Sequence, residues 1–137
     1  MTVVIANTTN SKYCHPVEDL EPAEKRTKDF ALRVLKLFRA LPKTEDARVL
    51  GRQLLRSGTS IGANYRAACR ARSRAEFVAK LGTVLEEADE TVYWLELMRD
   101  SEIFSAQRLN DLLNEANELV SIFISSIRTA KATKGAA

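Results

Sequence analysis

Apolar residues recur with a helical period along four segments of this chain. In residues 22–41 they lie four, three and four positions apart, which is the spacing of one face of an α-helix. These positions are Phe30, Val34, Leu37 and Leu41. Pro22 suits a first helical position and Pro42 cannot continue a helix, so both ends of this segment are marked.

The second segment begins after Thr44, a favourable N-cap, and extends to about Arg72. Residues 57–62 have poor helix propensity, yet the apolar positions keep one phase through them. Those positions are Leu54, Gly58, Ile61, Tyr65 and Ala68. We expect one unbroken helix, and the alternative is a break that makes five helices. Gly58 and Gly62 lie one turn apart, so another helix can approach closely there.

Ser73 and Glu76 have the spacing of a capping box, so the third helix should begin there and end near Ser101. Its apolar seam is Phe77, Leu81, Val84, Ala88, Thr91, Leu95 and Met98. Ser105 caps a fourth helix, whose apolar face is Leu109, Leu112, Ala116, Leu119, Phe123 and Ile127. Four amphipathic helices with short connections predict an all-α antiparallel four-helix bundle over residues 22–129. Residues 1–21 are expected to form a flexible arm and residues 130–137 a disordered tail.

Opposite charges gather in two blocks. Residues 52–80 hold seven Lys or Arg and one Glu, whereas residues 86–102 hold seven Asp or Glu and one Arg. At about 100° per residue, five arginines of the second helix share an arc of roughly 80° and span about 33 Å. This arginine stripe is Arg48, Arg52, Arg56, Arg66 and Arg70. With Arg74 of the same basic block, its members are candidate contacts to a nucleic-acid backbone. A partner's carboxylates or solvent could equally face them.

The third helix places an apolar cluster among its acids. Tyr93, Trp94 and Leu97 lie within or beside an acidic arc that includes Glu86 and Glu90, an arrangement typical of an interface with a polar rim. Packing of these residues under the fourth helix or the N-terminal arm is the alternative. Because a basic and an acidic surface complement each other head to tail, we expect a cyclic homo-oligomer.

No catalytic constellation is evident in the sequence. His15 is the single histidine, so zinc sites and serine–histidine chemistry lack a fixed partner. Cys14 and Cys69 are isolated, and two lone thiols fit a reducing cytoplasm. The chain has neither a secretory signal pattern nor an apolar run of about 20 residues. We expect a cytoplasmic, non-enzymatic protein without metal or cofactor.

Two stretches closely resemble a known bacterial family. They are residues 54–77, with the core Ser60-Ile-Gly-Ala-Asn64 and the helix start Arg72-Ser-Arg-Ala-Glu-Phe77, and residues 86–97. The family is that of the four-helix-bundle proteins encoded in intervening sequences of 23S ribosomal RNA genes, and the resemblance covers residues 23–128. It implies a barrel-shaped homopentamer. The chain is also similar to the accessory variability proteins of diversity-generating retroelements, which implies RNA or DNA and a reverse transcriptase as possible partners.

Overall fold

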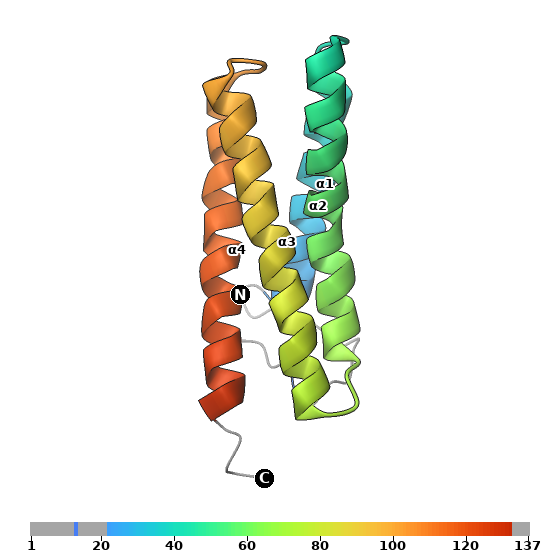
Figure 1. Ribbon diagram of the computed structural model, residues 1–137, viewed down its shortest axis with the longest axis vertical. Helices are drawn as coiled ribbons and strands as arrows, with labels where there is room; N and C mark the ends of the chain where they lie inside the picture. Colours follow the sequence, from blue (N-terminus) through green and yellow to red (C-terminus); the bar gives the residue numbers. More distant parts are fainter. Residues whose placement is uncertain (1–12, 14–21, 133–137) are drawn as a thin grey trace.

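Four long helices form the whole of the described structure, a computed structural model that covers Tyr13 and residues 22–132. They are α1 (Ala23–Ala40), α2 (Glu45–Cys69), α3 (Arg74–Asp100) and α4 (Ala106–Ala132). Successive helices run antiparallel and side by side, and α1 and α3 lie on opposite corners of the bundle (Figure 1). The predicted all-α four-helix bundle is therefore confirmed, with no strand in the described ranges. No described helix is both long and apolar enough to cross a membrane.

The helix ends follow the predicted signals, with differences of a few residues. α2 ends at Cys69, before the expected Arg72, and α4 continues to Ala132, past the expected end at residue 129. Ser73 caps α3 as predicted, because its hydroxyl accepts a hydrogen bond from the backbone N–H of Glu76 at 3.1 Å. Thr44 occupies the N-cap of α2, but its hydroxyl donates to the Asp46 carboxylate at 2.7 Å and makes no capping bond to the backbone.

α2 is continuous from end to end, so the alternative of a break near Ser57 is wrong. Residues 57–62 have poor helix propensity, and close packing against α1 stabilises the helix there. A Cβ added to Gly58 would lie 3.0 Å from a methyl group of Val34, and one added to Gly62 would lie 3.3 Å from the Thr27 hydroxyl. The two glycines thus bring α1 and α2 closer than side chains would allow.

The predicted seams meet in one core. Every seam residue predicted for α1 and α3 is buried, as are those of α4 except the half-buried Ile127. Three buried polar side chains, Thr27, Ser57 and Thr91, interrupt this apolar interior. Thr91 donates to the Ser57 hydroxyl at 2.9 Å and so links α3 to α2. No buried polar side-chain atom among the described residues lacks a hydrogen-bond partner.

Candidate nucleic-acid interface

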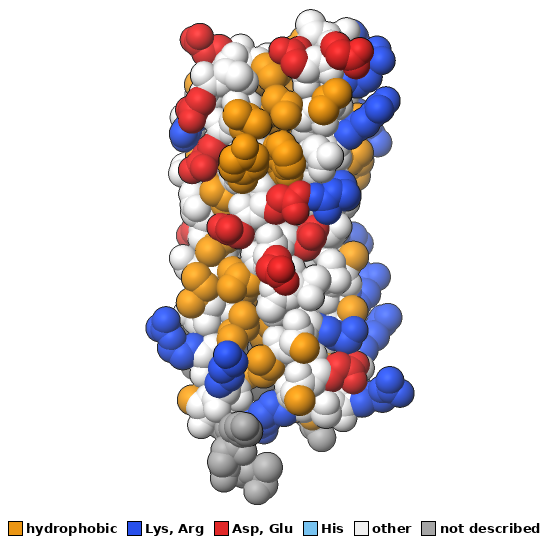
Figure 2. All heavy atoms as spheres, in the orientation of Figure 1, with side chains coloured by type: hydrophobic (Ala, Val, Ile, Leu, Met, Phe, Trp, Pro, Cys, Tyr) orange, Lys and Arg blue, Asp and Glu red, His pale blue; other side chains and the backbone are white. Residues whose placement is uncertain are grey.

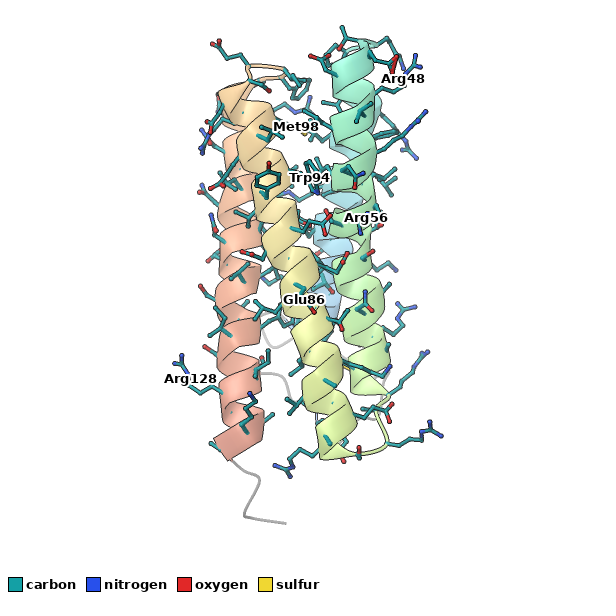
Figure 3. The ribbon with its side chains drawn as sticks, viewed as in Figure 1. Arg48, Arg56, Glu86, Trp94, Met98 and Arg128 are labelled. Carbon is teal, nitrogen blue, oxygen red and sulfur yellow. The ribbon has the colours of Figure 1, made fainter. Side chains whose placement is uncertain are left out.

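The unbroken α2 keeps the arginine stripe on one side of the helix. Arg48 and Arg52 lie within α2 and Arg70 is its C-cap residue. All three are exposed, and no ion pair involving them is found within residues 22–132. Arg66 is 51% exposed and approaches Glu24 of α1 at 3.7 Å. Arg48 projects away from the bundle near the first turns of α2 (Figure 3). We call these residues the four outer arginines: Arg48, Arg52, Arg66 and Arg70.

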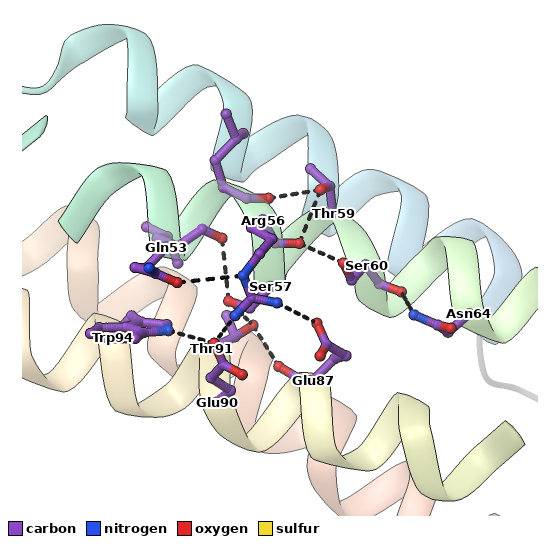
Figure 4. A network of polar contacts seen from close by, with 12 residues as sticks. Gln53, Arg56, Ser57, Thr59, Ser60, Asn64, Glu87, Glu90, Thr91 and Trp94 are labelled. Carbon is purple, nitrogen blue, oxygen red and sulfur yellow. Dashed lines mark hydrogen bonds and ion pairs between the residues drawn. The ribbon is translucent and has the colours of Figure 1, made fainter. Parts of the chain in front are cut away.

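Arg56 differs from the outer arginines because it turns toward α3. Its guanidinium group pairs with Glu87 at 3.3 Å and makes a second, closer ion pair with Glu90 (Figure 4). The indole N–H of Trp94 donates to the same Glu90 carboxylate at 2.9 Å. Arg56 lies at the edge of the predicted arc that faces α3, so its charge is largely neutralised within the bundle.

Arg74 lies at the first turn of α3, away from the stripe. Its guanidinium group donates to the carbonyl oxygen of Ala130 at 3.4 Å, near the end of α4. With Val78, Ala130 and Lys131 it lines a groove between these two helix ends. The structure therefore brings four of the six candidate arginines into one row and places Arg56 and Arg74 in contacts with other helices.

Charge divides the bundle into two unlike halves. Residues 22–73, which hold α1 and α2, carry 13 Lys or Arg and 4 Asp or Glu, a net charge of +9. Residues 74–132, which hold α3 and α4, carry 6 Lys or Arg and 11 Asp or Glu, a net charge of −5. Basic side chains follow the α2 edge and acidic side chains lie over the middle of α3 (Figure 2). The described part of the molecule is therefore dipolar, with the positive side on α1 and α2 and the negative side on α3 and α4.

The acidic arc of α3 contains one exposed aromatic side chain, Tyr93, beside the half-buried Trp94 and Leu97. Tyr93 is 55% exposed, and its ring meets Trp94 edge to face with centroids 5.1 Å apart. Trp94 is half-buried and packs against the core. Leu97 is half-buried, Glu86 is exposed, and Glu90 binds Arg56 and Trp94 as described.

An ion pair between α1 and α4 was not predicted. Arg26 binds Glu115 at 2.7 Å and Glu118 at 3.0 Å, and the Arg26 and Glu115 side chains are only 17% and 16% exposed. The hydrogen bond from Arg26 holds the pKa of Glu115 below its usual value, against the opposing effect of burial. These partners lie 89 residues apart, so no local spacing reveals them.

Cys69 and Tyr65 are two described residues whose side-chain chemistry differs from that of a free thiol or phenol. No cluster of three or more potential metal ligands occurs among the residues that the structure describes. Cys14 and His15 lie outside the described residues. Cys69 is buried, but it is disulfide-bonded, so its prediction as a lone thiol is wrong. Burial, reinforced by nearby Glu24, raises the pKa of Tyr65 to about 12, which keeps this phenol protonated at neutral pH.

Comparisons with known proteins agree on one family. The model of the 23S rRNA-intervening sequence protein family matches residues 19–125. A crystal structure of a protein of unknown function from the S23 ribosomal protein family of Bacteroides thetaiotaomicron is 40% identical, with a TM-score of 0.72 over 76% of this chain and 96% of that one. No curated protein matches the sequence. With a family match over most of its length, the chain belongs to the 23S rRNA-intervening sequence proteins.

Proposed function

We propose that this chain is a non-enzymatic, oligomeric binding module whose four outer arginines contact the phosphate backbone of a nucleic acid. The observation that carries the proposal is the continuity of α2, because it alone aligns arginines from both sides of the glycine-containing middle. Guanidinium groups suit this role, since their planar fork of donors matches phosphate oxygens.

The shape of the row supports a duplex as ligand. Arg48 and Arg70 stand about 33 Å apart along the helix, close to the ~34 Å length of one turn of duplex DNA. Arg56 turns toward α3, and between it and Arg66 the arc holds only the small side chains Thr59 and Ala63. Ala63 is exposed, and the hydroxyl of half-buried Thr59 bonds back to the Leu55 carbonyl at 2.7 Å. A backbone can therefore approach the middle of α2 without displacing a long side chain.

Backbone contact implies binding that depends on salt and little on sequence. Each neutralised phosphate releases counterions, so four contacts predict a slope of about −3.6 in log K against log salt for duplex DNA. The test is a fluorescence anisotropy titration of labelled duplex DNA and duplex RNA at two salt concentrations. Tight binding at low salt that weakens with this dependence supports the proposal, and absence of binding at low salt rejects it.

One observation favours a second candidate function. Arg56 already binds two glutamates of α3, so acids of this arc do accept guanidinium groups. The arginine stripe of one subunit could pair in the same way with the acidic face of its neighbour, which makes the protein an interaction module. Reversing Arg52 and Arg66 to Glu should then dissociate the assembly. Retained assembly with lost nucleic-acid binding selects the first function.

The resemblance extends the proposal to further partners. A homopentamer would repeat the four outer arginines around its rim, and several contacts to one strand would raise affinity through avidity. A reverse transcriptase is proposed as a protein partner on the resemblance to retroelement accessory proteins alone. A pull-down with a purified reverse transcriptase, the one encoded nearest to this gene, tests that partner.

A further inference from the structure

Two exposed apolar side chains on diagonal helices have opposite electrostatic surroundings. Leu32 of α1 is 54% exposed and Tyr93 of α3 is 55% exposed. On a helix surface, the residues three, four and seven positions away are the neighbours of a side chain.

Cations surround Leu32. Four of its six helical neighbours are basic, and one of these, Lys25, pairs with the single acidic neighbour Asp29 at 2.7 Å. Leu35, half-buried, is the sixth. We call this surface the basic α1 face: Leu32 with Lys25, Lys28, Lys36 and Arg39.

Carboxylates surround Tyr93 in the same geometry. Five of its six helical neighbours are acidic, and the sixth is the half-buried Leu97. We call this surface the acidic α3 face: Tyr93 and Leu97 with Glu86, Asp89, Glu90, Glu96 and Asp100. Glu90 is tied to Arg56, and the structure gives Glu86, Asp89 and Glu96 no ion pair within residues 22–132.

The two faces match in chemistry but cannot meet within one chain. Each pairs a large exposed apolar side chain with a ring of charges, and the rings have opposite sign. α1 and α3 occupy opposite corners of the bundle, with α3 in front and α1 behind (Figure 1). Their outer faces therefore point away from each other, and only a second copy can bring them together.

We propose that the acidic α3 face binds the basic α1 face of a second copy of this chain, with Leu32 packed against Tyr93 and Leu97. The contact is heterologous, so each copy uses one face of each kind and assembly proceeds head to tail. This inference deepens the oligomeric part of the proposed function by naming α1 in place of α2 as the complement. It leaves the four outer arginines of α2 available for phosphate.

Two variants that each damage one face test the contact. Leu32→Asp puts a carboxylate opposite the acidic α3 face, and Tyr93→Asp removes the ring and adds an acid to that face. Sedimentation velocity of the full chain should show an assembly for the wild-type protein and monomers for each variant alone. An equimolar mixture should give a dimer and nothing larger, because only one intact α3 face and one intact α1 face remain to pair.

Controls separate this contact from misfolding and from the nucleic-acid proposal. Ile124→Asp changes another exposed apolar residue, 40% exposed on α4, and should assemble like the wild type. Circular dichroism melting confirms that each variant is folded. A monomeric wild-type protein, unchanged assembly of either variant, or a mixture that stays monomeric would overturn the inference. None of these readouts involves nucleic acid, and monomeric Leu32→Asp should still bind a duplex if the proposed function holds.

Discussion

The α1–α2 half and the α3–α4 half differ in charge, and the arginines of the basic half divide accordingly. Arg26 extends from α1 to two glutamates of α4, and Arg56 extends from α2 to two glutamates of α3. Each boundary between the halves is thus crossed by an arginine bound to a pair of acids. The four outer arginines make no such crossing within the described residues. An arginine's position relative to the acidic half therefore decides whether its charge is paired within the bundle.

The largest predicted effect concerns the close packing that holds the basic half together. Gly58→Leu forces a side chain against Val34, where even a Cβ would lie 3.0 Å from a methyl group. Overpacking of this kind should lower the free energy of unfolding by about 3 kcal/mol, measured by urea denaturation. Gly82→Leu on α3 is the matched control. A Cβ there meets nothing within 4 Å, and the better helix former should stabilise the protein by about 0.5–1 kcal/mol.

Loss of the Arg26 ion pair between α1 and α4 should have the next largest effect on stability. Arg26→Gln leaves Glu115 partly buried without its cation and should cost about 2 kcal/mol at neutral pH. Because the folded state lowers the pKa of Glu115, this contribution is complete above the usual glutamate value near 4.5 and disappears as the pH falls through the lowered pKa. Denaturation curves of both proteins between neutral and acid pH should therefore converge. A constant difference at every pH would contradict the electrostatic account.

Loss of the Arg56 ion pairs between α2 and α3 should have a smaller effect on stability. Arg56 is 49% exposed, so Arg56→Gln should lower the free energy of unfolding by only about 0.5–1 kcal/mol. Trp94 is the single tryptophan and shares Glu90 with Arg56, so its fluorescence should change in this variant. Arg52→Gln, on the same helix, should leave both stability and fluorescence unchanged. Equal effects of the two substitutions would contradict the distinction between Arg56, which binds glutamates of α3, and the outer arginines.

The period of the apolar residues predicted the fold well, because the period of each helix can be found without knowing which helices lie beside it. The seams of α1 and α3 are buried as expected, and the phase of Leu54, Ile61 and Ala68 foretold the continuity of α2. Helix ends were less exact, because α2 ends at Cys69, before the expected Arg72, and α4 continues to Ala132. Residues 1–21 and 133–137 lie outside the described ranges apart from Tyr13, so the predicted arm and most of the tail stay predictions.

The candidate site was predicted only as far as helical geometry extends. The shared arc of the arginines follows from α2 alone, but the contacts of Arg56 depend on which helix lies beside it and in what register. The bond between Ser57 and Thr91 belongs to that register and joins residues 34 positions apart. The basic α1 face was not predicted, because residues 52–80 hold a denser block of cations, although the cations of α1 are visible in the sequence.

The most direct test compares two pairs of charge-removing variants in the anisotropy assay. Arg52→Gln/Arg70→Gln removes two outer arginines, whereas Arg108→Gln/Arg128→Gln removes two exposed arginines from α4. Both pairs lower the net charge equally. The account predicts that the α2 pair weakens binding at low salt and reduces the salt slope by about 1.8, while the α4 pair changes neither appreciably. Equal losses for the two pairs would mean that net charge alone attracts the nucleic acid, and would contradict a site on α2.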